Sequence, residues 1–135
     1  MKSANSTSPT GTYVLDTSAL ITYLAEERGA DKVKAVRVSA SLPFIALTEL
    51  YYVLWRKQDQ VLAEEAIQHV LSWRLPLLTA DERLSLSAGY LKARFRLGLA
   101  DSYMAAFALA SQASLVTKDP DFRALEPELK LLYIA

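Results

Sequence analysis

Short apolar runs alternate along this chain with longer segments in which apolar and polar residues recur at helical spacing. The runs are rich in branched aliphatic and aromatic side chains and are too short for buried helices, which favours β-strands. We therefore predict strands at 13–15, 44–47, 75–78, 115–116 and 131–134.

The segments between these runs predict helices. Their apolar residues recur every three or four positions, as Leu20, Ile21 and Leu24 do, so each segment has one face for the core. The last segment differs, because it is rich in alanine and other small residues around its whole circumference. This composition predicts a helix that is buried on most sides. The predicted helices lie at 18–26, 31–39, 47–57, 61–71, 79–98 and 100–112.

Local signals define several helix boundaries. The polar stretch Gln58-Asp59-Gln60 interrupts the apolar pattern and predicts a turn between two helices packed as a hairpin. Thr79 and Glu82 have the spacing of a capping box, in which each side chain bonds a free backbone N–H, and Gly98 is a stop signal. We therefore expect a helix from Thr79 to Gly98, and we assign Asp81, inside the box, to structure.

Strands that alternate with helices indicate an α/β domain with a mainly parallel sheet, because a helix is the usual crossover between parallel strands. A chain of 135 residues, 52% of them hydrophobic, forms one core and is too short for two ordinary domains. We expect a flexible tail at 1–11 and one domain at 12–135. In such a sheet, ligands bind beyond the carboxyl ends of the strands.

Composition excludes several classes of function. The chain has no cysteine, so disulfides, thiolate nucleophiles and sulfur-bound zinc are impossible, and the reducing cytoplasm is the expected location. The first residues lack the apolar region of a signal peptide, and no apolar stretch reaches the roughly 20 residues of a membrane span. The net charge is zero, so any contact with nucleic acid depends on a local basic patch.

Carboxylates follow the predicted strands. Asp16 ends the first run, Glu49 comes two residues after the second, Asp119 and Asp121 follow the fourth, and Asp101 begins the alanine-rich helix. One acid at a helix start is most often a cap or a partner of the helix dipole. Several on one rim repel, at a cost on the order of 4 kcal/mol for two of them about 4 Å apart. A bound Mg²⁺ or Mn²⁺ removes that cost, so the set predicts a divalent cation site.

Four stretches resemble the PIN domains, and within them the VapC-type ribonuclease toxins of toxin–antitoxin pairs. They are YVLDTSALITYL, ALTELYYVLWR, LGLADSYMAAFALA and LVTKDPDF, in the family's order from about residue 12 onwards. The resemblance implies a single three-layer α/β/α domain with a mainly parallel, four- to five-stranded sheet. It also implies catalytic, metal-binding acids at Asp16, Glu49, Asp101 and Asp119, an auxiliary metal ligand at Asp121, and supporting hydroxyls at Thr17 and Thr117.

The activity implied by the resemblance is metal-dependent hydrolysis of RNA that leaves a 5′-phosphate and a 3′-hydroxyl. The resemblance also implies a VapB-type antitoxin in a groove near the first helices. We also expect a homodimer. Attack through the ribose 2′-hydroxyl generally needs an acid and a base, often two histidines, whereas His69 is the only histidine and is interpreted as an ordinary helix residue. Phosphate contact is assigned to Lys92, Arg94 and Arg96, whose alternative role is to pair with the helix dipole.

Two other classes of function remain open. A binding module would have an acidic pocket that no longer cuts, or would serve mainly to hold a partner. The apolar faces around Tyr23, Leu54 and Trp55 are candidates both for the antitoxin groove and for a homodimer contact. An aspartyl-nucleophile phosphatase would need a second acid two residues after Asp16, where the chain has Ser18. A receiver domain would need an acidic pair that the first strand does not supply.

Overall fold

The structure, a computed structural model, describes residues 12–135, so the predicted tail at 1–11 lies outside the described residues. Its strands are all parallel and form one sheet in the order β4-β3-β2-β5-β6. The strands are β2 (Tyr13–Leu15), β3 (Ala40–Pro43), β4 (Leu77–Leu78), β5 (Ser114–Thr117) and β6 (Leu131–Tyr133).

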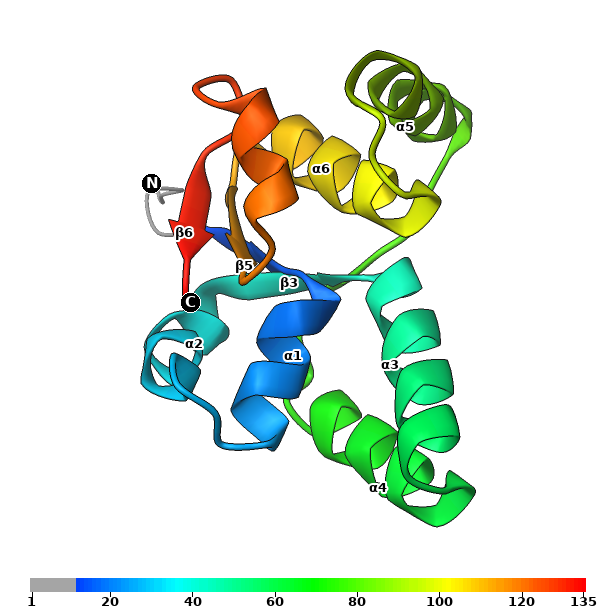
Figure 1. Cartoon of the computed structure of the whole chain (residues 1–135), viewed down its shortest axis with the longest axis vertical. Helices are drawn as coiled ribbons and strands as arrows, with labels where there is room; N and C mark the ends of the chain where they lie inside the picture. The colour runs from blue at the N-terminus through cyan, green and yellow to red at the C-terminus, as the bar shows by residue number, and fades with distance from the viewer. Residues whose placement is uncertain (1–11) are drawn as a thin grey trace.

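Helices flank this sheet. They are α1 (Thr17–Leu24), α2 (Ala30–Val36), α3 (Phe44–Lys57), α4 (Gln60–Leu71), α5 (Glu82–Phe95) and α6 (Leu99–Ser111), with 3₁₀ helices η1 (Arg37–Ser39) and η2 (Pro120–Leu125). α1 and α2 lie on one side of the sheet and α5 and α6 on the other, which confirms the predicted α/β class (Figure 1). The predicted α3–α4 hairpin is also present, while the helix predicted at 31–39 divides into α2 and η1. No helix within residues 12–135 is long and apolar enough to cross a membrane.

The prediction of a strand at 44–47 is wrong. The second strand lies just before this apolar run, which instead begins a helix. The strand is Ala40–Pro43, which pairs with β2 on one side and β4 on the other. Pro43 has φ −65° and ψ 141° and serves as the N-cap of α3, so the helix begins directly at Phe44. Glu49 therefore lies in the second turn of α3 and not in the first turn of a helix that begins at residue 47.

The boundaries of α5 also differ from the prediction. Asp81 caps the helix in place of Thr79, because its carboxylate accepts a hydrogen bond of 2.8 Å from a first-turn backbone N–H. The helix ends at Phe95, since Arg96 adopts a left-handed conformation with φ 58°. Gly98 is the N-cap of α6 and does not end α5. The assignment of Asp81 to structure is unchanged.

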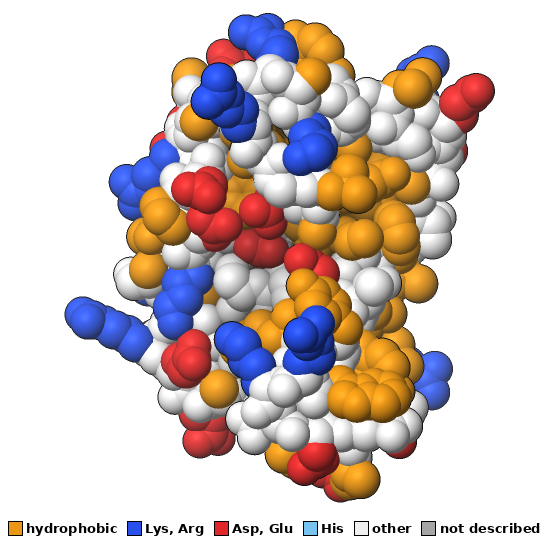
Figure 2. Space-filling view, turned by 45° about the vertical axis from the view of Figure 1, so that its right-hand side comes forward, with side chains coloured by type: hydrophobic (Ala, Val, Ile, Leu, Met, Phe, Trp, Pro, Cys, Tyr) orange, Lys and Arg blue, Asp and Glu red, His pale blue; other side chains and the backbone are white. Residues whose placement is uncertain are grey.

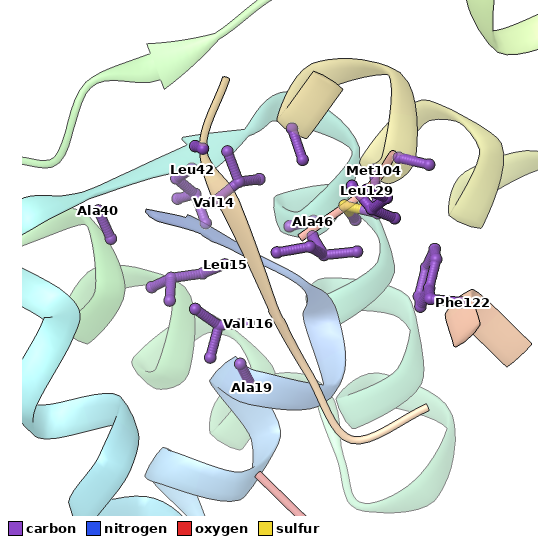
Figure 3. Packing of buried hydrophobic residues seen from close by; sticks show 14 of the residues in the cluster. Val14, Leu15, Ala19, Ala40, Leu42, Ala46, Met104, Val116, Phe122 and Leu129 are labelled. Carbon is purple, nitrogen blue, oxygen red and sulfur yellow. The ribbon is translucent and has the colours of Figure 1, made fainter. Parts of the chain in front are cut away.

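The two central strands form the middle of the hydrophobic core. Val14 and Leu15 of β2 and Val116 of β5 are at most 1% exposed, and Figure 3 shows them among side chains of α1, α3 and α6. The predicted burial of the small-residue helix is confirmed, because α6 is buried at all of positions 104–108. A strand buried on both faces leaves only its carboxyl end for polar side chains that meet solvent.

Gly29 lets the turn before α2 pack closely against the backbone near Ile134. Its φ is 101°, which other residues rarely adopt, and a Cβ at this position would collide with the backbone carbonyl of Ile134. We predict that Gly29→Ala lowers the free energy of unfolding by about 2 kcal/mol or more. The control Gly89→Ala adds a methyl group to open space inside α5 and should raise stability by up to about 1 kcal/mol. Urea unfolding measures both, and a Gly29→Ala protein as stable as the parent would contradict the prediction.

Candidate metal-dependent active site

The register of the central strands places Asp16 opposite Thr117. Leu15 pairs with Val116, and the N–H of Asp16 donates to the carbonyl of Val116 at 3.1 Å. Asp16 is only 4% exposed and Thr117 is fully buried. Thr117 Oγ1 donates to Asp16 Oδ2 at 2.6 Å, a length typical of a hydroxyl bonded to a carboxylate. Strand pairing therefore fixes the position of this carboxylate at the edge of the sheet.

The hydroxyls that follow Asp16 bond to acids and do not cap α1. Thr17 Oγ1 donates to Glu49 Oε1 at 2.6 Å, which joins the start of α1 to the second turn of α3. Ser18 Oγ donates to Asp16 Oδ2 at 2.9 Å. The start of α1 therefore orients two of the predicted acids, Asp16 and Glu49.

The other predicted acids come from α6 and from the loop after β5. Asp101 is half-buried in the first turn of α6. Asp119 is half-buried and caps η2, with its Oδ1 accepting a 2.9 Å hydrogen bond from the N–H of Asp121, whereas Asp121 is exposed. The charge of Asp119 acts on Asp101 more strongly than that of Asp121 does. Asp119 is thus the inner acid of this loop and Asp121 the outer one.

Burial and neighbouring charge raise the pKa of two of these acids, Asp101 and Asp16. The pKa of Asp101 is raised from 3.8 to about 7, mainly by partial burial. Burial also raises the pKa of Asp16, although the hydroxyl hydrogen bonds to its carboxylate oppose that shift. Asp101 lies within electrostatic reach of all the other predicted acids, whose charges raise its pKa in the order Asp16, Asp119, Glu49 and Asp121.

The donor atoms suit a hard divalent cation. They are carboxylate oxygens supported by hydroxyl groups, and Mg²⁺ and Mn²⁺ prefer oxygen ligands. Within residues 12–135, no three acidic or histidine side chains converge closely enough to enclose an ion by themselves. Mg²⁺ usually keeps several waters and takes only one or two carboxylates together with phosphate oxygens, so the arrangement fits its usual mode of binding. A cation here would also relieve the repulsion that raises the pKa of Asp101.

The basic residues predicted to contact phosphate lie at the exposed end of α5. Lys92 Nζ donates to the carbonyl of Leu97 at 2.9 Å, and Arg94 Nη1 donates to the hydroxyl of Tyr90 at 2.7 Å. Arg96 supplies the left-handed residue at the helix end. In the described part of the chain, none of the three forms an ion pair with an acid of the site. Their contact with phosphate therefore remains a prediction.

Ser18 is the residue of this site that the sequence analysis did not assign. Besides its bond to Asp16, its Oγ lies 3.4 Å from Thr117 Oγ1 and accepts a hydrogen bond of 3.0 Å from the N–H of Lys118. The available signal was its place two residues after the acid, at the start of a helix. A hydroxyl at that place has the same sequence pattern as an ordinary helix cap.

The sequence matches the family model of the PIN domain over residues 13–126, a span that contains all five predicted acids. The chain therefore belongs to the PIN-domain family, whose members are in general nucleases. No curated protein is similar enough in sequence to count as a match.

Several solved structures share this fold. VapBC-1 from nontypeable Haemophilus influenzae is 25% identical with a TM-score of 0.68, covering 90% of this chain and 97% of that one. VapBC2 from Rickettsia felis, bound to a DNA fragment from its promoter, is 20% identical with a TM-score of 0.74, covering 92% and 99%. A toxin–antitoxin complex from Klebsiella pneumoniae is 17% identical with a TM-score of 0.71, covering 92% and 98%. These neighbours agree with the resemblance to VapC-type proteins.

The raised pKa of Asp101 makes the stability of the metal-free protein depend on pH. Between 3.8 and about 7 the folded chain holds a proton that the unfolded chain has released. The stability that this carboxyl contributes is therefore fully present below pH 3.8. It decreases as the pH rises from 3.8 and is lost once the pH has passed about 7. We predict that, in EDTA, unfolding free energy falls less between about pH 5 and pH 8 in Asp101→Asn than in the parent.

Glu65→Gln is the matched control, because Glu65 is an exposed acid on α4 outside this group. The unfolding free energy of this variant, measured with urea, should depend on pH as that of the parent does. Parallel stability curves for Asp101→Asn and the parent would show that Asp101 is not the titrating group.

Proposed function

We propose that this chain is a metal-dependent endoribonuclease of the VapC type, which hydrolyses RNA phosphodiester bonds with bound Mg²⁺ or Mn²⁺. The observation that carries the proposal is the group of carboxylates around Asp101, where partial burial and the charges of the neighbouring acids together raise its pKa to about 7. A fold alone does not determine a function, so the proposal depends on this site. The lack of cysteine suits action in the reducing cytoplasm.

In the proposed mechanism, Asp16, Glu49, Asp101 and Asp119 hold one or two cations, with Asp121 as an auxiliary ligand. A bound cation stabilises charge on the transition state and lowers the pKa of its water. Thr17 Oγ1 donates to Oε1 of Glu49 and so orients this carboxylate, and one of the four acids would also accept the proton of the attacking water. Water would form the new bond to phosphorus as the P–O3′ bond breaks, and the leaving 3′-oxygen would take a proton from solvent, so the products carry a 5′-phosphate and a 3′-hydroxyl.

The surroundings of the acids suit a polyanion. Figure 2 shows acidic side chains gathered near the middle of one face, with basic side chains above and below them. Lys and Arg at such positions bind phosphates and set the register of a nucleic acid without reading its sequence. We propose that Lys92, Arg94 and Arg96 are among the residues that hold the RNA backbone in this way.

Substitution of two acids tests the nuclease. We predict that the protein cuts a mixed pool of structured and single-stranded RNA with Mn²⁺ or Mg²⁺ and not with EDTA. Asp16→Asn and Asp101→Asn should each slow cutting at least about a hundredfold, close to 3 kcal/mol of transition-state stabilisation. Asp59→Asn should cut like the parent, because it removes one carboxylate but leaves a good cap for α4. Gel analysis of end-labelled products measures both the rate and the chemistry of the new ends.

Other outcomes distinguish the alternative functions. Undiminished cutting in both acid variants would contradict the assignment of the site. A parent protein that binds Mn²⁺ without cutting would favour the binding module. An aspartyl phosphatase would instead release phosphate from a monoester and carry it on Asp16, whose Oδ2 is already held by Ser18 and Thr117.

We further propose that a VapB-type antitoxin binds in a groove between α1, α2 and α4. Its apolar lining includes Tyr23, Leu24 and Leu62, and its charged residues are three acids and one lysine. His69 lines this groove on α4 and lies outside the group of acids, as the sequence predicted. An amphipathic segment with basic residues beside its apolar face would complement both features. We assign the predicted homodimer contact to the exposed side chains of Tyr52 and Trp55 on α3.

A large charged side chain in the groove tests this partner. We predict that Ala66→Arg weakens copurification with a coexpressed VapB-type antitoxin by at least about tenfold, because one blocked anchor commonly costs more than 1 kcal/mol. Ala93→Arg places the same side chain on the exposed face of α5 and should copurify like the parent. Equal copurification of the two variants would place the partner elsewhere.

A further inference from the structure

Two hydroxyl groups connect Asp16 to the loop that follows β5. Ser18 Oγ accepts from the N–H of Lys118 at 3.0 Å and donates to Asp16 Oδ2 at 2.9 Å. Thr117 Oγ1 accepts from the N–H of Asp119 at 3.0 Å and donates to the same oxygen at 2.6 Å. A hydroxyl has one hydrogen, so each group gives its single donor to the carboxylate while it accepts from the loop backbone.

These bonds make the two oxygens of Asp16 unequal. Oδ2 receives both hydroxyl hydrogens, and hydrogen bonds to a charged acceptor are about twice as strong as neutral ones. The carboxylate of Asp16 cannot turn without breaking both bonds. The carboxylate also accepts a hydrogen bond from the backbone of Thr17, but Oδ1 receives neither hydroxyl hydrogen, so we assign Oδ1 to the cation.

We propose that Ser18 is a positioning residue of the cation site, acting through Asp16 and touching neither the metal nor the RNA. The proposal rests on the proposed metal-dependent function. Thr117 belongs to β5 itself, whereas Ser18 comes from α1 and bonds the backbone of Lys118 across 100 positions of sequence. Ser18 thus fixes the position of the start of α1, and of Asp16, relative to the loop that carries Asp119.

Removal of the Ser18 hydroxyl has two defined consequences. Oδ2 of Asp16 loses one of its two hydroxyl donors, and the N–H of Lys118 loses its acceptor. The carboxylate then turns more freely and the loop shifts relative to α1. Loss of a group that orients a metal ligand typically weakens metal binding by 10- to 100-fold.

Mn²⁺ binding tests the proposal, measured by electron paramagnetic resonance of the free ion with the full chain. Ser18→Ala should raise the Kd for Mn²⁺ about tenfold or more, and raise by a similar factor the Mn²⁺ concentration that gives half-maximal RNA cutting. Ser18→Thr keeps the hydroxyl and should bind like the parent. Ser85→Ala removes a hydroxyl bond of 2.8 Å to the backbone of α5, away from the acids, and should change neither quantity.

A second variant separates loss of the hydroxyl donor from misfolding of the protein. Ser18→Cys keeps the size of the side chain but offers only a weak donor, so it should weaken Mn²⁺ binding in the same direction as Ser18→Ala. Parent-like Mn²⁺ affinity in a folded Ser18→Ala or Ser18→Cys overturns the role of Ser18 and leaves the nuclease proposal intact. A parent protein that neither binds Mn²⁺ nor cuts RNA overturns both proposals.

Discussion

Asp16 is almost completely buried at the carboxyl end of β2, the middle strand of the sheet, and a carboxylate in that position is costly unless donors surround it. The donors come from two places that only the fold brings together, Ser18 at the start of α1 and Thr117 at the end of β5. Their arrangement requires parallel pairing of β2 with β5 in one register, because a slip by one residue would turn Thr117 to the other face. The core of the sheet and the first acid of the site are therefore fixed by the same strand pairing.

Repulsion among the acids is the second constraint on the site. Partial burial of Asp101 on α6, together with the charges of Asp16, Asp119 and Glu49 near the sheet edge, raises the pKa of Asp101 to about 7. In the metal-free protein, the raised pKa of Asp101 lowers stability at neutral pH. The packing of α6 against the central strands offsets this loss. Such a cost is typical of a site arranged for a ligand of opposite charge.

Much of this arrangement follows from the sequence, and the exceptions have physical causes. Apolar runs predicted the central strands because strands buried on both faces have few polar positions. The strand Ala40–Pro43 was missed because serine and proline usually signal a turn, and its structure depends on β2 and β4 pairing on either side. The five acids were predicted from their places after strands and at a helix start, although Glu49 reaches the site from a helix. The role of Ser18 was not visible, because it depends on a loop 100 residues away.

Anomalous X-ray diffraction from crystals of the full chain grown with Mn²⁺ tests the central claim most directly, because it locates the ion without reference to activity. We expect a peak among the acids, in contact with Oδ1 of Asp16 and with Asp101 in the same coordination shell. An ordered site without a peak, or an ion bound away from Asp16 and Asp101, would contradict the assignment of this edge of the sheet as a metal-dependent nuclease site.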